Sequence, residues 1–328
     1  MNLLTNEEWN KYFSLIKNPH VLQSYEWGEL KSYFGWYPYR INIGEKPIQI
    51  LFRKLPLGFS IGYIPKINLD KMDKNLWSEI DTICKTQRSI FLKFEPDQFY
   101  NPQTNVEMDS SFQESKAIQP ARTIIVDISG SEDEWLQRMK SKTRYNIKLA
   151  IKKEIKVLLS DDIDTFYQLM LETGDRDKFG VHSKEYYQLA FQLFNSSKNV
   201  ALLLAYYKDE PLAGLMVFKS GTRSWYFYGA SNNKERNRMP TYLLQFEAMK
   251  WAKTQGCTSY DLWGIPDEEE KVLESEFDKR SDGLWGVYRF KRGFGGEIVR
   301  SAPALDRVYN PLLYYAISWY QKFRGSFL

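Results

Sequence analysis

The two halves of the sequence present the same features in the same order, and this repeat constrains the fold more than any other property of the chain. Each half holds two apolar runs joined by a turn, which is typical of a β-hairpin. The first hairpin comprises Ile48–Arg53 and Phe59–Ile64 around Pro56, and the second comprises Leu212–Phe218 and Trp225–Tyr228 around Gly221.

The segments after the two hairpins also match. In each half a helix-like segment is followed by Lys-Thr-Gln, at 85–87 and 253–255, and then by a strand, at 90–94 and 260–263. Pro47 and Pro211, which precede the hairpins, are 164 residues apart, and Pro96 and Pro266, which follow the strands, are 170 apart. This nearly constant offset predicts a duplicated α/β unit.

The length of 328 residues fits two domains. We place the boundary near Gly130, just after a strand at 124–128, so that the first domain covers 1–129, completed by 304–328, and the second covers 130–303. Further helices are expected at 27–33, 76–85, from 134 onward, and at 161–173, 183–194, 242–253 and 308–319, with connections at 97–116 and 268–274. The aromatic helix at 308–319 either packs back on the first half or touches a membrane.

Composition argues against several classes of protein. With two cysteines, two histidines and no CxxC pair, we expect no metal site, no histidine-based triad and a reduced cytoplasmic compartment. We find no Walker or GxGxxG loop, which argues against an NTPase or a dinucleotide enzyme. We expect neither a signal peptide nor a membrane span. The net charge of +4 does not by itself indicate a class of binding partner, unless the basic residues are clustered.

The segment 285–296 is the first candidate for chemistry, because it combines basic side chains, aromatic rings and glycines. These residue types suit the binding of an anion. If residues 287–292 are extended, Arg289 and Lys291 form a pair on one face. The other face then carries Tyr288, Phe290 and Arg292. The alternative is an edge strand whose charges only prevent aggregation.

A second candidate is the segment 138–156, which holds eight basic residues and one acidic residue. Along a single helix, basic residues recur at every fourth position beside a stripe of isoleucines. The basic positions are Lys140, Arg144, Lys148, Lys152 and Lys156, and the isoleucines are Ile147, Ile151 and Ile155. The pattern predicts either a polyphosphate partner or a solvated surface helix.

Two further residues stand out singly. Lys31 follows Trp27 by one helical turn, so the ring and the ammonium share a face, with plain surface exposure as the alternative. Glu95 ends a strand just before Pro96, and it is either a carboxylate at the rim of a sheet or an ordinary turn residue.

Motifs along nearly the whole chain carry a resemblance to a known family. The first half holds Gln23–Gly28, Tyr63–Lys66, Phe91–Pro96 and Ile118–Pro120, and the second holds Lys142–Ile147, Trp225–Ser231, Tyr260–Pro266 and Tyr288–Lys291. In this order they resemble the Fem family of aminoacyl-tRNA-dependent peptidoglycan bridge transferases. The chain lacks the long helical-hairpin arm of some members and is similar to the compact, FemX-like form.

The resemblance implies an α/β fold of two tandem GNAT-like acyltransferase domains with a cleft between them. It implies an aminoacyltransferase that moves an amino acid from aminoacyl-tRNA to the stem-peptide amine of a peptidoglycan precursor, either lipid II or UDP-MurNAc-pentapeptide. We expect no cofactor, a monomer, and a cytoplasmic location that can include the inner face of the membrane.

The resemblance also assigns roles to residues. By this resemblance, Lys31 corresponds to a residue that contacts precursor phosphates, and Glu95 corresponds to a carboxylate at the end of a strand. Phe290 and Lys291 correspond to the pair that handles the donor ester. Lys291, as a permanent cation, would stabilise the oxyanion, and Glu95 would orient the attacking amine. Other substrate-binding residues expected are Trp27, Tyr63, Lys66, Tyr186 (or Tyr187), Tyr242 and Arg289, and phosphate-binding residues are Lys142, Arg144, Lys148 and Arg292.

The sequence departs from the family at two places. His182-Ser183 stands where relatives have an arginine that contacts phosphate. Ile67 follows Lys66 in place of the family's Gly-Pro, and this second departure would indicate a different precursor. Two other functions stay open. One is an acyl-CoA-dependent N-acyltransferase, although Asn237–Pro240 stands where a glycine-rich pyrophosphate loop would be. The other is a non-catalytic module that binds tRNA or an anionic membrane.

Overall fold

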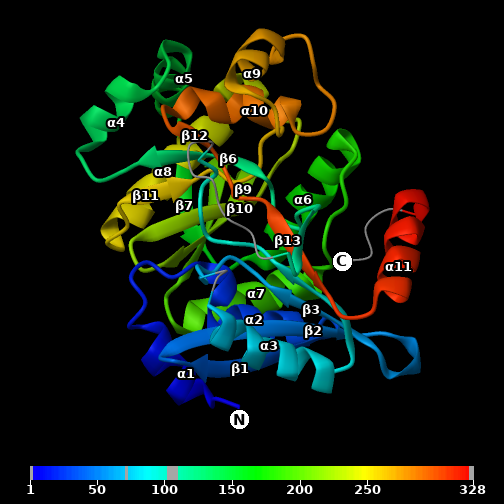
Figure 1. Cartoon of the computed structure of the whole chain (residues 1–328). Helices are drawn as coiled ribbons and strands as arrows, with labels where there is room; N and C mark the ends of the chain where they lie inside the picture. Colours follow the sequence, from blue (N-terminus) through cyan, green and yellow to red (C-terminus); the bar gives the residue numbers. More distant parts are fainter. Residues whose placement is uncertain (1–2, 71–72, 102–109, 325–328) are drawn as a thin grey trace. The chain divides into compact units, whose positions relative to one another are not determined.

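The computed structural model of the chain describes residues 3–70, 73–101 and 110–324, without the side chains of 320–324. The chain divides into two compact units: unit 1 is Met1–Ala121 with Arg300–Leu328, and unit 2 is Arg122–Val299. Each unit is built on one sheet with helices packed against it (Figure 1).

Unit 1 holds a six-stranded sheet in the order β1-β2-β3-β4-β13-β5. The strands are β1 (Trp36–Ile43), β2 (Lys46–Lys54), β3 (Ser60–Ile64), β4 (Ser89–Phe94), β5 (Phe112–Ser115) and β13 (Ala304–Val308). The helices are α1 (Asn6–Phe13), α2 (Tyr25–Ser32), α3 (Lys74–Thr86) and α11 (Pro311–Arg324), with 3-10 turns η1 (Val21–Gln23) and η2 (Pro56–Gly58). Trp77 of α3 packs edge-on against Phe94 and Phe112, so α3 covers the core of this sheet.

Unit 2 holds a seven-stranded sheet in the order β12-β6-β11-β10-β9-β8-β7. The strands are β6 (Arg122–Asp127), β7 (Ile155–Ser160), β8 (Val200–Tyr207), β9 (Glu210–Ser220), β10 (Arg223–Ser231), β11 (Ser259–Asp261) and β12 (Glu297–Arg300). The helices are α4 (Glu132–Arg138), α5 (Ser141–Lys152), α6 (Ile163–Asp177), α7 (Lys184–Ser196), α8 (Pro240–Thr254), α9 (Glu270–Glu276) and α10 (Trp285–Lys291), with η3 (Arg236–Arg238) and η4 (Arg292–Phe294).

Strand pairing confirms the predicted repeat. In unit 1, β2 pairs antiparallel with β3, and β3 pairs parallel with β4 after the crossover helix α3. In unit 2, β9 pairs antiparallel with β10, and β10 pairs parallel with β11 after α8. Parallel neighbours cannot be joined by a tight turn, so each half needs the helix that the sequence places between its hairpin and its last strand.

Local sequence signals fix the ends of several of these elements. Ser131 and Glu134 form a capping box at the start of α4, and the Ser183 hydroxyl accepts the N–H of Tyr186 at the start of α7. Gly44 and Glu45, both with positive φ, make the two-residue turn between β1 and β2.

The division between the units falls after Ala121, not at Gly130. The reason is that β6 pairs antiparallel with β11, so this strand completes the sheet of unit 2. At the other end of the chain, β13 pairs with β4 and β5, which draws the segment from Arg300 onward into unit 1.

The prediction of one continuous basic helix over 138–156 was wrong. The chain forms α4, a break at Met139–Lys140, α5, and then the strand β7, so Lys156 and Ile155 lie on a strand. Ile147 is buried, but Ile151 is exposed. The predicted connections also contain structure, because β5 lies within 97–116 and α9 begins within 268–274 and ends at Glu276. Residues 102–109 fall outside the described part. Val308 ends a strand, and the C-terminal helix begins at Pro311.

The segment 287–292 is not extended either. It belongs to α10, in which residues two positions apart point to roughly opposite sides, so Arg289 and Lys291 do not form a pair on one face. Among the helices of the described residues, none is both long and apolar enough to cross a membrane.

Candidate active site

Lys291 is a buried lysine held by backbone carbonyls. Its Nζ donates to the carbonyl oxygens of Trp263 (3.0 Å) and Gly264 (2.9 Å), just beyond the end of β11. The same Nζ lies 5.5 Å from the centre of the Tyr226 ring. Trp263 has φ 59, so the chain turns sharply there and presents both carbonyls to one amine. Helix α10 supplies the lysine, and the end of a central strand supplies its acceptors.

This environment corrects the expectation of a permanent cation. Burial lowers the pKa of Lys291 to about 7, and the nearby carboxylate of Asp261 opposes part of that change. The two carbonyls can accept the two N–H groups of the neutral amine, which leaves its lone pair to exchange a proton. Near neutral pH the group can therefore act as a proton donor or as a proton acceptor.

Asp261 is a site residue that sequence reasoning missed. It is buried on β11, accepts a hydrogen bond from the Thr123 hydroxyl, and accepts the N–H of Trp263 at 2.7 Å. Burial raises the pKa of Asp261. Because it binds the Trp263 backbone, the carboxylate also fixes the turn that holds Lys291. The signal available in the sequence was an acidic residue inside the otherwise apolar predicted strand 260–263.

Tyr226 was missed as well. A side chain on Gly229 would place Cβ 2.0 Å from the Tyr226 hydroxyl, so glycine is required for the ring to lie where it does. Beside it, β10 shifts register between Tyr226 and Tyr228, a bulge that redirects side chains near this site.

The other basic side chains near Lys291 are occupied by contacts within the protein. Arg289 donates to the carbonyls of Phe277 (2.8 Å), Asp278 (3.1 Å) and Arg280 (3.2 Å). Arg292 forms a two-pronged ion pair with Glu274, and this pairing lowers the pKa of Glu274 to about 2. Both arginines therefore hold α9 and the segment after it against α10.

Phe290 and Tyr242 belong to one aromatic cluster. Their ring centres lie 5.0 Å apart, and Phe294 lies 5.1 Å from Phe290 and 6.0 Å from Tyr242. Both side chains are partly buried against the core of unit 2.

The basic face of α5 is shorter than the sequence predicted. Arg144 donates to the carbonyls of Leu136, Gln137 and Met139, so it caps the end of α4. Lys140 forms an ion pair with Glu274 at 3.1 Å. Lys142, Lys148 and Lys152 are exposed.

Tyr186 lies in a cluster of tyrosines in unit 2. Its hydroxyl is 3.1 Å from the Tyr228 hydroxyl, and the His182 ring stacks on its ring at 4.0 Å. Tyr187 packs edge-on against Tyr228 at 5.2 Å. Histidine at 182 thus supports the tyrosine that the resemblance pointed to.

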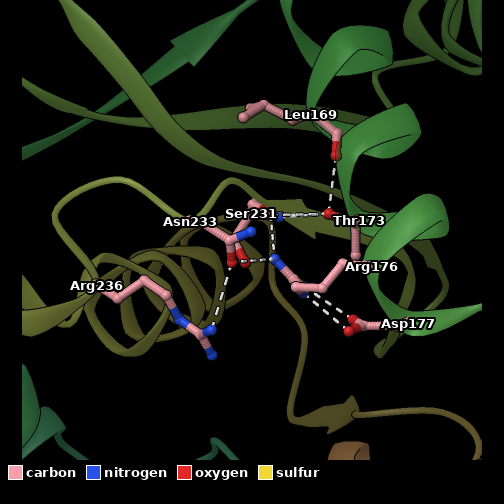
Figure 2. Close-up of polar contacts among 7 residues, drawn as sticks. All are labelled: Leu169, Thr173, Arg176, Asp177, Ser231, Asn233 and Arg236. Atoms are coloured by element: carbon pink, nitrogen blue, oxygen red, sulfur yellow. Dashed lines mark hydrogen bonds and ion pairs between the residues drawn. The ribbon is translucent and has the colours of Figure 1, made fainter.

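The connection between β10 and α8 is tied to α6 by the contacts in Figure 2. Thr173 Oγ1 accepts the N–H of Ser231 (2.9 Å) and donates to the carbonyl of Leu169 (2.8 Å). Arg176 donates to the Ser231 carbonyl (2.7 Å) and to both carboxylate oxygens of Asp177 (2.8 Å each). Other ion pairs in this connection are Lys234 with Glu210 and Arg238 with Glu235, each at 2.6 Å.

In unit 1, Glu95 is buried and held by backbone groups. The carboxylate follows β4 and accepts the N–H groups of Ile118 and Gln119. Burial raises the pKa of Glu95, while the charge of Lys66 and the two N–H groups act in the opposite direction. Glu95 therefore lies directly after the end of β4, where the sequence placed it, and its buried, hydrogen-bonded carboxylate is not that of an ordinary turn residue.

Tyr63 and Lys66 lie beside this carboxylate. The Gln119 amide donates to the Tyr63 hydroxyl at 3.1 Å, and Lys66 Nζ donates to the Ser301 hydroxyl at 3.0 Å. Elsewhere in unit 1, Lys31 Nζ lies 4.6 Å from the centre of the Trp27 ring, which confirms that the two share a face of α2. Within the described ranges, no three of His, Cys, Asp and Glu come together to hold a metal ion.

The fold defines the class of protein. Two sheets of matching topology, each with a crossover helix, have the fold of two tandem GNAT-like domains. The structure is similar to a tandem GNAT protein from the clavulanic acid biosynthesis pathway, with a TM-score of 0.51 and 9% identity over 92% of this chain and 94% of that one.

The family follows from the sequence. The FemAB family matches residues 105–208 and 204–322, and the chain belongs to this family. A relative from Staphylococcus epidermidis, named lipid II:glycine glycyltransferase, is 25% identical over 96% of this chain and 94% of its own length. The crystal structure of FemX superposes with a TM-score of 0.81 and 23% identity, covering 97% of this chain and 99% of that one.

Proposed function

We propose that this protein is an aminoacyltransferase that moves an amino acid from an aminoacyl-tRNA to an amine on the stem peptide of a peptidoglycan precursor, as part of cell-wall bridge formation. Family membership and relatives named glycyltransferases support an acyl transfer of this kind. The observation that carries the proposal is Lys291, a buried amine with a pKa of about 7.

In the proposed reaction, the amine nitrogen attacks the ester carbonyl between the amino acid and the tRNA ribose. A new C–N bond forms, the ester C–O bond breaks, the attacking nitrogen loses a proton and the ribose oxygen gains one. Lys291 as an ammonium stabilises the oxyanion and gives its proton to the leaving oxygen. The neutral amine that remains takes up the proton lost by the attacking nitrogen, so the group returns to its starting state.

Neighbouring residues support Lys291 in this role. Asp261 holds the Trp263 backbone and places a carboxylate near the amine, which limits how far burial lowers its pKa. Phe290 and Tyr242 supply an aromatic surface on the same unit, against which the terminal adenine of a tRNA could stack. Lys142 and Lys148, exposed on α5, suit contacts with tRNA phosphates.

In the same proposal, residues of unit 1 bind the acceptor. Glu95 is held by two backbone N–H groups and can direct an oxygen at the attacking amine. Tyr63 and Lys66 lie beside it, and Lys31 over the Trp27 ring suits contact with a precursor phosphate. On unit 2, Tyr186 is proposed as a further substrate contact. The protein would act as a monomer on the cytoplasmic side of the membrane.

An acyl-CoA donor is less well supported. The β10–α8 connection, where a pyrophosphate would bind, carries Arg238, which is paired with Glu235. It also contacts Arg176 of α6, which is paired with Asp177. A pyrophosphate would have to displace these carboxylates.

The test supplies donors and acceptors separately. Purified protein is incubated with charged tRNA pools or acetyl-CoA, together with lipid II or UDP-MurNAc-pentapeptide, and the precursor mass is measured. We expect the mass of one amino acid to be added only with charged tRNA. Acetylation of the precursor, or tRNA binding without any mass change, would refute the proposal in favour of one of the other two functions.

A further inference from the structure

One end of unit 1 exposes apolar side chains that its core does not use. On α11, Leu313, Tyr314 and Ile317 pack inward against a small cluster formed by Ile61, Ile90 and Phe91. The side chains on the opposite face of α11, spaced at helical intervals, point to solvent. They are Leu312 (85% exposed), Tyr315 (64%) and Trp319 (66%).

The turn between β2 and β3 adds to the same surface. Leu55 and Phe59, at its two ends, pack against the same small cluster as α11, so the turn and the helix share one end of the sheet (Figure 1). Between them, Leu57 is 86% exposed and has φ 60. A leucine in the left-handed region is strained, and this one gains no burial in return, so its exposure needs another explanation.

The charge around these side chains has one sign. Residues 53–60, 82–90 and 307–319, which make up this end, contain no aspartate or glutamate. Lys54, Lys85 and Arg88 are exposed there, and Arg88 lies over the Phe59 ring at 4.9 Å. Asp81 of α3, which reaches this region, is paired with Arg307 at 2.6 Å.

We propose that this surface, comprising Leu57, Leu312, Tyr315 and Trp319 with Lys54, Lys85 and Arg88, docks on an anionic phospholipid bilayer. Tyrosine and tryptophan favour the boundary between headgroups and acyl chains, leucines enter the apolar layer, and cations attract anionic headgroups. An anionic bilayer matches both the apolar and the cationic part of the surface. The inference rests on the proposed function only for the biological reason to bind a membrane, because a lipid-linked precursor lies in a membrane.

The docking surface is separate from the candidate site of unit 1. Tyr309 and Asn310, which lead into α11, bond to the carbonyl of Ile90 near the start of β4, whereas Glu95 follows the end of that strand. At about 3.3 Å per residue, these ends are roughly 17 Å apart. Changes on the docking surface therefore leave the residues proposed for binding and catalysis in place.

The test is binding to vesicles without tRNA or precursor. Wild-type protein is sedimented with vesicles of phosphatidylcholine alone or with about 30% phosphatidylglycerol, and compared with the double variant Leu312→Ser/Arg88→Gln. The matched control is Leu15→Ser/Lys17→Gln, since Leu15 is 77% exposed and Lys17 is exposed at the end of α1. We expect binding only to the anionic vesicles, a loss of about tenfold or more in the first variant, and no loss in the control.

A second measurement tests whether the proposed surface itself enters the bilayer, without relying on the affinity of the protein for vesicles. Cys84 and Cys257 are both buried, so a cysteine introduced at Leu312 or at Leu15 can be labelled selectively with an environment-sensitive dye. The dye at 312 should shift to shorter wavelength with anionic vesicles, and the dye at 15 should not.

Equal vesicle binding by the two double variants, or no binding by the wild-type protein, would overturn the inference. So would a wild-type dimer that Leu312→Ser converts to a monomer, because a second copy would then cover the surface. The proposed function is judged separately. Leu312→Ser/Arg88→Gln should still modify the soluble UDP-linked precursor, so loss of vesicle binding and loss of aminoacyl transfer are distinguishable.

Discussion

Replacing Lys291 by methionine separates the cost of burying this side chain from its contribution to turnover. Burial lowers the pKa of Lys291 from 10.5 to about 7. At about 1.4 kcal/mol per pH unit, this corresponds to roughly 5 kcal/mol that the folded protein loses at pH 7 and below. Methionine avoids that cost but leaves the carbonyls of Trp263 and Gly264 without their donor, at about 1–3 kcal/mol each. The two effects therefore oppose each other and are of the same order of magnitude at pH 7.

The pH dependence then identifies the lysine. Between about pH 7 and 10.5, Lys291 is neutral in the folded state and charged in the unfolded state. The unfolded state therefore binds one more proton, and stability rises with pH by up to about 1.4 kcal/mol per unit. Lys291→Met lacks this contribution, so the wild-type protein should gain stability relative to the variant as the pH rises through this window.

The assay is urea-induced unfolding at three pH values between about 7.5 and 9.5. Lys271→Met, at an exposed position of α9, is the matched control and should follow the wild-type protein. In aminoacyl transfer, Lys291→Met should lose about 100-fold or more in kcat with little change in KM. A constant stability difference between wild type and Lys291→Met across this range would refute the reasoning, because it would mean that the ammonium is solvated.

Three further outcomes are expected. Glu95→Gln should lower kcat by about tenfold or more, measured by precursor mass, with an unchanged thermal unfolding midpoint, and a stable but fully active variant would exclude a role in the reaction. Gly229→Ala should lower the unfolding midpoint, because its Cβ would lie 2.0 Å from the Tyr226 hydroxyl; an unchanged midpoint would contradict this packing. The stability supplied by Glu274, whose pKa is lowered to about 2 by Arg292, should be present above about pH 4.5 and disappear as the pH falls toward 2. After discounting for solvent screening it should amount to about 1 kcal/mol, and urea unfolding of Glu274→Gln measures it as a difference from wild type that vanishes at low pH.

The order of strands and helices was predictable because its signals are local. Two hairpins, their crossover helices and the strands that close them follow from short apolar runs, turn residues and caps, and the strand pairing confirms each of them. The domain boundary was placed at Gly130 for the same reason. Residues 122–127 contain no local signal that β6 pairs with a strand more than a hundred residues later.

The site itself was only partly predictable. The sequence pointed to Lys291 and Glu95 through motifs, and it placed Glu95 correctly at the end of a strand. It described Lys291, however, as a permanent cation on a strand. The short segment Trp285–Lys291 alternates aromatic and basic residues from Tyr288 onward and fits either period, so only its packing against the rest of unit 2 selects the helix.

The amino-acid sequence by itself determined that the chain is a duplicated α/β protein of the Fem type, because hydrophobic period, turn residues and motifs are properties of neighbouring positions. It also predicted a lysine, Lys291, at the centre of the proposed chemistry. Only the tertiary structure decided the state of that lysine. Its pKa depends on burial, on carbonyls at positions 263 and 264, and on the Asp261 carboxylate, and these groups meet only after β11 and α10 have packed together.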